Sequence, residues 1–140
     1  MNDKIVKKLL KAAFKASKNG EVPVAALVIK EDKIISIAHN KRRKNGSVLE
    51  HAEIRAVRMA GKKLGDWRLN GCDLYVTLKP CNMCEVVLRE SRLDRVFYLI
   101  EPLEYKKKYD KTEMISIEKS YPQHVDAYRK IFSDFFETKR

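Results

Sequence analysis

The apolar residues of the chain fall into segments of two kinds, which predict helices and strands. Residues 3–18 carry apolar side chains every three or four positions, so they form an amphipathic helix with Asp3 near its start. Short, β-branched apolar runs predict strands at 22–30, 34–40, 72–78 and 94–100, and a short fifth strand at 114–118. Helical periodicity returns at 50–64, at 81–90 and from Pro122 onward.

The order of these segments predicts an α/β fold. Only "EDK" separates the first two strands, so they form a hairpin, whereas the later strands alternate with helices. Such an order implies a mixed five-stranded sheet with helices on both faces, a three-layer α/β/α arrangement. The length of 140 residues predicts a single domain over 1–140.

The composition narrows the class of protein. An apolar fraction of 44% is typical of a globular chain. No apolar run approaches the roughly 20 residues needed to span a bilayer, and the first residues lack the apolar core of a signal peptide, so we expect a cytoplasmic protein. Three cysteines do not form a disulfide framework in a chain of this length. A close cysteine pair therefore indicates a metal or redox site.

The charge is strongly positive. Thirty Lys and Arg residues against 19 Asp and Glu residues give a net charge of +11. Such an excess favours polyanionic partners, because a protein that neutralises phosphates releases their counterions. A solvated, lysine-rich surface would give the same composition. Clustering of the basic residues at 40–46 and 105–111 favours nucleic acid.

The sequence "PCNMC" places Cys81 and Cys84 three residues apart at the start of a predicted helix. Both sulfur atoms can then point to one spot. Unpaired N–H groups at a helix start lower thiol pKa values, and the thiolate is the form that binds metal. A thioredoxin-like redox pair has the same spacing, but it is expected after the first strand of a βαβ unit, whereas this pair follows the third predicted strand.

His51 is the residue that best completes a metal site with the two cysteines. A lone histidine at a helix start is usually a capping or surface residue. With Cys81 and Cys84, however, it gives a Cys2His set, and three protein ligands with one open position are typical of catalytic zinc. Cys72 would be the fourth ligand of a structural site. Nine residues of mostly extended chain separate Cys72 from Cys81, so we interpret Cys72 as a buried apolar side chain.

Glu53 is the candidate proton carrier. In a regular helix it lies about 200° around the axis from His51, so the two would not bind one ion. At a helix start His51 can reach the metal while Glu53 lies beside the open position, where a carboxylate can take a proton from water and return it elsewhere. Zinc lowers the pKa of bound water to about 7, which makes hydroxide available for hydrolysis. Considered alone, Glu53 is more simply interpreted as a first-turn glutamate that the helix dipole favours. The presence of three candidate zinc ligands nearby makes the role of proton carrier the better interpretation.

The sequences "HAE" at 51–53 and "PCNMC" at 80–84 together resemble the signature of the zinc-dependent nucleoside and nucleobase deaminases. Four longer segments resemble the TadA-type tRNA-specific adenosine deaminases in order and spacing: "EVPVAALVI", "HAEIRAV", "LYVTLKPCNMC" and "SRLDRVFY". The resemblance covers residues 5–98 and 133–140. It implies a cytidine-deaminase-like fold and one zinc ion per chain, held by His51, Cys81 and Cys84.

The resemblance also implies roles for residues around the metal. Glu53 would carry protons from the water to the purine ring and to the leaving ammonia. Asn40 would hydrogen-bond the target base, and the backbone around Ala52 would help to fix the water or the base. Phe135 would lie near the RNA loop. Without the resemblance, Asn40 is more simply interpreted as a turn residue, and Phe135 as a residue of the apolar core.

The substrate that the resemblance implies is adenosine at the wobble position of a tRNA anticodon, converted to inosine by a homodimer. An anticodon loop presents splayed bases, so one base can enter a pocket without the breaking of a duplex. The net charge of +11 and the basic cluster at 41–44 agree with this substrate independently of the resemblance.

The chain departs from the family pattern at three places. Ala25 stands where the family usually has glycine, Lys79 stands where it has glutamate, and "LIEPLEYKKKYDK" replaces a glycine-rich segment that normally lines the RNA site. One alternative is therefore a deaminase of a small free nucleobase or nucleoside, such as cytosine, guanine or cytidine. Another is a catalytically silent RNA-binding subunit, which would not need Glu53.

Overall fold

The computed structural model describes residues 3–101, 115–116 and 118–138, although not the side chains of 132, 136 and 138. The chain divides into two compact units, residues 1–104 and 105–140. The single domain predicted over residues 1–140 stays a prediction.

The first unit is built on a mixed sheet of four strands in the order β2-β1-β3-β4. The strands are β1 (Ala25–Lys30), β2 (Lys33–His39), β3 (Cys72–Leu78) and β4 (Arg95–Ile100). β1 runs antiparallel to both β2 and β3, whereas β3 and β4 are parallel. β2 and β3 therefore point the same way on either side of β1, as expected for a hairpin followed by crossover connections.

The predicted fifth strand at 114–118 is wrong. Residues 115 and 116 are irregular, and Glu118 begins a short 3-10 helix, η1 (Glu118–Ser120). Residues 114 and 117 lie outside the described part of the chain. An alternating apolar pattern becomes a strand only where a neighbouring strand pairs with it, and in the described residues β4 is the last strand of the sheet.

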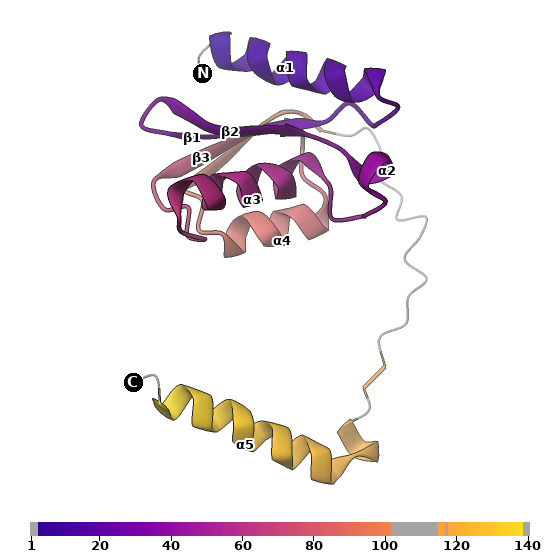
Figure 1. Ribbon diagram of the computed structural model, residues 1–140, viewed down its shortest axis with the longest axis vertical. Helices are drawn as coiled ribbons and strands as arrows, with labels where there is room; N and C mark the ends of the chain where they lie inside the picture. The colour runs from indigo at the N-terminus through magenta and orange to yellow at the C-terminus, as the bar shows by residue number, and fades with distance from the viewer. Residues whose placement is uncertain (1–2, 102–114, 117, 139–140) are drawn as a thin grey trace. The chain divides into compact units, whose positions relative to one another are not determined.

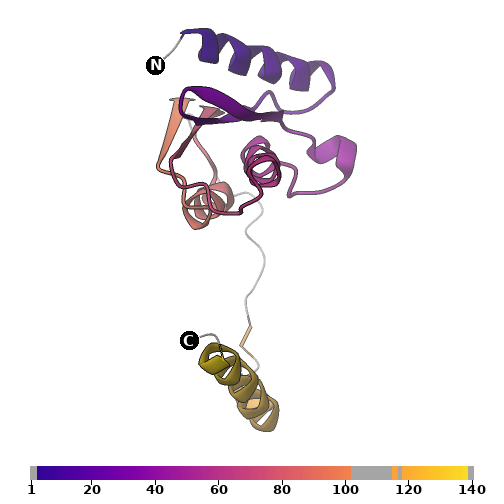
Figure 2. The same ribbon diagram turned by 60° about the vertical axis from the view of Figure 1, so that its left-hand side comes forward.

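Helices cover both faces of the sheet, as Figures 1 and 2 show. α1 (Asp3–Lys18) lies on one face, and α3 (Ala52–Leu64) and α4 (Asn82–Glu90) lie on the other. The three-layer α/β/α arrangement is thus confirmed. A short helix that the sequence did not predict, α2 (Arg42–Asn45), interrupts the loop before α3. α5 (Pro122–Thr138) belongs to the second unit.

Each face of the sheet has its own apolar core. On the α1 face, Leu9 and Ala13 pack against Leu27 and Ile29. On the other face, Val28, Leu74 and Val76 are buried against α3 and its surroundings. Of the helices described, none is both long and apolar enough to cross a bilayer.

Small side chains allow α3 to lie close against the sheet. Ala52, Ala56 and Ala60 recur every four residues and are all fully buried. The Ser36 hydroxyl of β2 donates a hydrogen bond to the Ala56 carbonyl over 2.7 Å, which fixes the helix along the sheet. The position of α3, and of the residues that precede it, therefore depends on alanine-sized side chains on this face.

We expect Ala56→Leu to lower the free energy of unfolding by about 1–3 kcal/mol, because a larger side chain must push α3 off the sheet. Met59→Leu on the same helix is the control, since Met59 is 41% exposed. Its effect should stay within about 0.5 kcal/mol. Equilibrium denaturant unfolding measures both variants, and equal stabilities would contradict the close packing of α3.

Candidate active site

The structure brings His51, Cys81 and Cys84 together at the starts of two neighbouring helices. His51 is the N-cap residue of α3, Cys81 is the N-cap residue of α4, and Cys84 lies in the first turn of α4. One ligand atom from each lies within 4.8 Å of the other two. The imidazole Nδ1 is 3.2 Å from the Cys84 sulfur and 3.8 Å from the Cys81 sulfur. Such a group could hold a metal ion.

The two N-cap residues have extended backbones, which explains how their side chains meet. The φ and ψ angles are −66° and 147° at His51, and −67° and 169° at Cys81. Neither side chain makes a capping hydrogen bond to its own helix. The predicted helices from residues 50 and 81 begin later, at Ala52 and Asn82. The angular conflict between His51 and Glu53 in a regular helix therefore does not arise.

The environment of the imidazole fits a metal ligand. Nδ1 faces the two sulfur atoms, whereas the buried Nε2 has no hydrogen-bond partner among the described residues. A histidine that binds metal through one nitrogen carries its proton on the other. The structure thus identifies Nδ1 as the nitrogen available to an ion.

A hydrogen bond between the two thiols shifts their pKa values in opposite directions. The hydrogen bond from Cys84 lowers the pKa of Cys81 to about 5, and N–H groups at the start of α4 act in the same direction. The same hydrogen bond, together with burial, raises the pKa of Cys84. Cys81 is therefore the ready thiolate, and the N–H groups of the helix start support it as the sequence predicts.

Glu53 lies beside this group, in the first turn of α3. Its side chain is buried, at 4% exposure. Burial raises the pKa of its carboxyl, while hydrogen bonding with Cys84 opposes that rise. A carboxyl group whose pKa is raised toward neutrality can both accept and return a proton.

Cys72 does not belong to the group. It is fully buried in the apolar core with Leu74 and Leu88, where burial raises the pKa of its thiol. This location agrees with its interpretation as an apolar side chain.

Asn40 is held at the start of α3, next to a cavity of about 420 Å³. Its Oδ1 accepts a hydrogen bond from the backbone N–H of Ala52 over 2.8 Å, and the asparagine is 7% exposed. Glu21, Arg42 and Arg43 also line the cavity. The structure thus links the end of β2 directly to the helix that follows His51.

Phe135 lies on α5 in the second unit, where its side chain is 55% exposed. Its predicted place near an RNA loop stays a prediction. The basic cluster at 105–111 lies outside the described residues.

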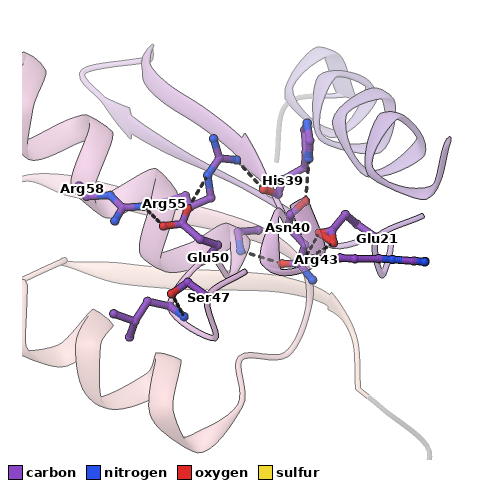
Figure 3. Close-up of polar contacts among 10 residues, drawn as sticks. Glu21, His39, Asn40, Arg43, Ser47, Glu50, Arg55 and Arg58 are labelled. Atoms are coloured by element: carbon purple, nitrogen blue, oxygen red, sulfur yellow. Dashed lines mark hydrogen bonds and ion pairs between the residues drawn. The ribbon is translucent and has the colours of Figure 1, made fainter. Parts of the chain in front are cut away.

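Sequence reasoning missed a polar network that Figure 3 shows around Arg55. The Arg55 guanidinium donates to the His39 carbonyl over 2.6 Å and pairs with the Glu50 carboxylate over 3.2 Å. Glu50 also pairs with Arg58 over 2.9 Å. Arg55 therefore ties the residue before Asn40 to the residue before His51. No clear signal for this network was present in the sequence, because Arg55 and Arg58 stand five and eight residues after Glu50, outside the i,i+4 spacing of a helical ion pair.

Comparison with known proteins decides the family. The model of the MafB19-like deaminase family matches residues 1–140. The chain belongs to this deaminase family. The tRNA-specific adenosine deaminase of Buchnera aphidicola subsp. Schizaphis graminum is 36% identical to our deaminase over 137 residues, which are 94% of this chain and 91% of the relative.

A relative from Aquifex aeolicus, also a tRNA-specific adenosine deaminase, is 43% identical over 93 residues. The matched residues are 66% of our deaminase and 62% of the relative, so our deaminase spans less than two thirds of the length of that relative. With the Buchnera protein, it confirms the predicted resemblance to the TadA-type tRNA-specific adenosine deaminases.

Solved structures confirm the fold of the deaminase. A structure from studies of A-to-I editing by tRNA:A34 deaminases at the wobble position of transfer RNA has a TM-score of 0.71 and 36% identity, and covers 72% of this chain and 73% of that one. A guanine deaminase from Bacillus subtilis has a TM-score of 0.73, with coverages of 93% and 95%. At 23% identity it supports the fold alone.

We expect Cys81→Ser to weaken metal binding by the deaminase by on the order of a hundredfold or more, because even partners outside the ligand shell are worth about 10- to 100-fold. Cys72→Ala is the matched control, since it removes a buried thiol outside the group. Metal content after dialysis against a chelator measures both. Equal loss from the two variants would show that the site does not depend on Cys81.

We expect Arg55→Met to lower the free energy of unfolding of the deaminase by about 1–3 kcal/mol, because Glu50 and the His39 carbonyl lose a partly buried partner. Arg58→Met removes the exposed partner of Glu50 and should cost less than about 1 kcal/mol. Denaturant unfolding of both variants tests the difference. An Arg58→Met variant as unstable as Arg55→Met would contradict the special role of Arg55.

Proposed function

We propose that this deaminase is a zinc-dependent hydrolase that converts adenosine to inosine at the wobble position of a tRNA anticodon. One observation carries the proposal: His51, Cys81 and Cys84 converge within 4.8 Å, and a buried carboxyl, Glu53, lies beside them. The names of the Buchnera and Aquifex relatives supply adenosine in tRNA as the substrate, and the solved structure from studies of tRNA:A34 deaminases supplies the wobble position.

One imidazole nitrogen and two sulfur atoms form a donor set that suits zinc. His51 Nδ1 and the sulfurs of Cys81 and Cys84 would hold one ion per chain. When bound, zinc supplies a Lewis acid that makes water nucleophilic near neutral pH. Three protein ligands leave one position for that water, as in other catalytic sites.

Glu53 moves the protons of the hydrolysis. Water adds its oxygen to C6 of adenine, the C6–N bond to the amino group breaks, and ammonia leaves. The carboxylate of Glu53 accepts one proton from the attacking water and gives it to the ring nitrogen next to C6. It then accepts the proton of the new hydroxyl group on C6 and gives it to the amino group, which departs as ammonia and leaves a carbonyl at C6. Burial of Glu53 supports this role, because a raised pKa brings the protonated and ionised forms closer in free energy.

Asn40 and Ala52 orient the base. Because the Ala52 N–H occupies Oδ1 of Asn40, the side-chain NH₂ of Asn40 is the group left to donate to an acceptor on the base. The network of Arg55 and Glu50 holds the backbone on either side of these residues. Phe135 would contact the RNA loop.

Charge favours tRNA over a small free nucleobase or nucleoside. A neutral free base gives no reason for a net charge of +11, whereas an anticodon loop offers both phosphates and splayed bases. A deaminase of a small free nucleobase or nucleoside stays the second candidate, because the same zinc site would serve either substrate. If the proposed function is correct, we expect the protein to be cytoplasmic. We also expect it to form a homodimer, which analytical ultracentrifugation can measure.

The decisive experiment treats total tRNA with the protein and sequences it for adenosine-to-inosine changes. The wild type should modify position 34 of one or a few tRNAs. Glu53→Gln should keep its zinc and lose about 10²- to 10⁴-fold in rate, because it keeps the shape of the side chain and removes the proton carrier. Undiminished turnover by Glu53→Gln would refute the role of Glu53. Ammonia release from guanine, cytosine or cytidine, with no inosine in tRNA, would favour the second candidate.

A further inference from the structure

α1 carries six lysines on one side of the helix. At about 100° per residue they fall within an arc of roughly 100°, on the side away from the buried Leu9, Ala13 and Ala16. Asp3 is the one acidic residue of the helix. The residues of this lysine face are Lys4, Lys7, Lys8, Lys11, Lys15 and Lys18, all of them exposed.

Few acidic groups balance this charge. Lys7 forms an exposed ion pair with Asp3 over 3.6 Å. In the described part of the chain, Lys8, Lys11 and Lys15 form no ion pair, and the ammonium group of Lys18 lies over the Phe14 ring at 4.9 Å. No acidic side chain of the described residues therefore pairs with the three lysines in the middle of the lysine face, Lys8, Lys11 and Lys15.

The lysine face continues into the basic residues beside the candidate active site. Where the chain leaves α1, the Glu21 carboxylate accepts the backbone N–H of Arg43 over 2.6 Å (Figure 3). The Arg43 guanidinium lies against Gly20, 3.3 Å from the position a Cβ would take there. Gly20, Glu21 and Arg43 all line the cavity that Asn40 borders. The chain just after the lysine face therefore borders the same cavity as Asn40.

Lys15 and Lys41 confirm the proximity of the two basic segments. Arg55, burial, Lys44 and Lys15, in that order, lower the pKa of Lys41. A residue of α1 thus lies within electrostatic range of the loop that carries the cluster at 41–44. The two basic segments therefore lie near each other.

We propose that the lysine face of α1 binds the phosphate backbone of the tRNA outside the anticodon loop. This inference rests on the proposed function. Lys8 stands ten residues before Lys18, about 15 Å farther along the helix from the site, so it reaches nucleotides beyond those next to the target base. Rows of lysines bind phosphates without regard to base sequence.

An anionic membrane is the competing partner for a basic helix. Membrane-surface helices insert an apolar face into the lipid. The apolar face of α1 already packs against Leu27 and Ile29 of the sheet, and the exposed Leu10 and Phe14 flank the lysine face only on one side. The observations therefore favour RNA.

The test compares two triple variants of equal charge. One replaces Lys8, Lys11 and Lys15 by glutamine. The control replaces Lys33, Lys62 and Lys63, which are exposed at the start of β2 and at the C-terminal end of α3. Glutamine is a good helix former, and thermal unfolding checks that both variants fold.

Dissociation constants for tRNA are measured against salt concentration. Loss of three phosphate contacts should reduce the slope of log K against log salt by about 2–3, while the control keeps the wild-type slope. For inosine formation, the α1 variant should raise KM on the order of tenfold and leave kcat unchanged. A seven-nucleotide loop without its stem should bind both variants equally.

Three results would overturn the inference: equal salt slopes for the two variants, an α1 variant with reduced kcat and unchanged KM, or lost binding to phosphatidylserine vesicles with unchanged tRNA binding. The last would assign the lysine face to a lipid surface. If the wild type makes no inosine but the α1 variant alone weakens tRNA binding, the proposed reaction fails and the inference stands.

Discussion

The candidate active site depends on one constraint of the sheet, the common direction of β2 and β3. Both strands run antiparallel to β1, so their carboxyl ends lie at the same edge. Each strand is followed by a helix whose first residues return across that edge, which is where α/β folds build their sites. His51 and Cys81 stand at these two helix starts although 30 residues separate them in the chain. A reversal of either strand would separate the metal ligands.

Elements with a strong local pattern could be predicted from the sequence. The helix at 3–18 and the strand at 72–78 agree with α1 and β3 in both bounds, because the apolar residues recur with a helical period in α1 and with a period near two in β3. The grouping of His51 with the two cysteines was also predictable, since few residue sets offer nitrogen and sulfur ligands at helix starts. The role of Arg55 was not, because it depends on a carbonyl 16 residues away that only the fold brings near. The prediction of a fifth strand was wrong for a related reason, because a segment forms a strand only when a neighbouring strand pairs with it.

Two departures from the family pattern leave the candidate metal group intact. Ala25 is fully buried at the start of β1, where its N–H donates to the Thr77 hydroxyl over 3.1 Å. A methyl group in place of glycine is thus accommodated inside the core. Lys79 pairs with Glu101 over 3.7 Å on a half-exposed surface. Neither contact involves His51, Cys81 or Cys84, so the chemistry and the surface around it can vary separately.

The uncapped starts of α3 and α4 have a cost for the fold. A serine or aspartate at an N-cap stabilises a helix by about 0.5–2 kcal/mol, and here histidine and cysteine fill both places without a capping bond. The side chains of these two N-cap residues, His51 and Cys81, point toward each other and not toward the N–H groups of their own helices. An ion bound between them would join the starts of both helices, and its loss would free both first turns to fray together.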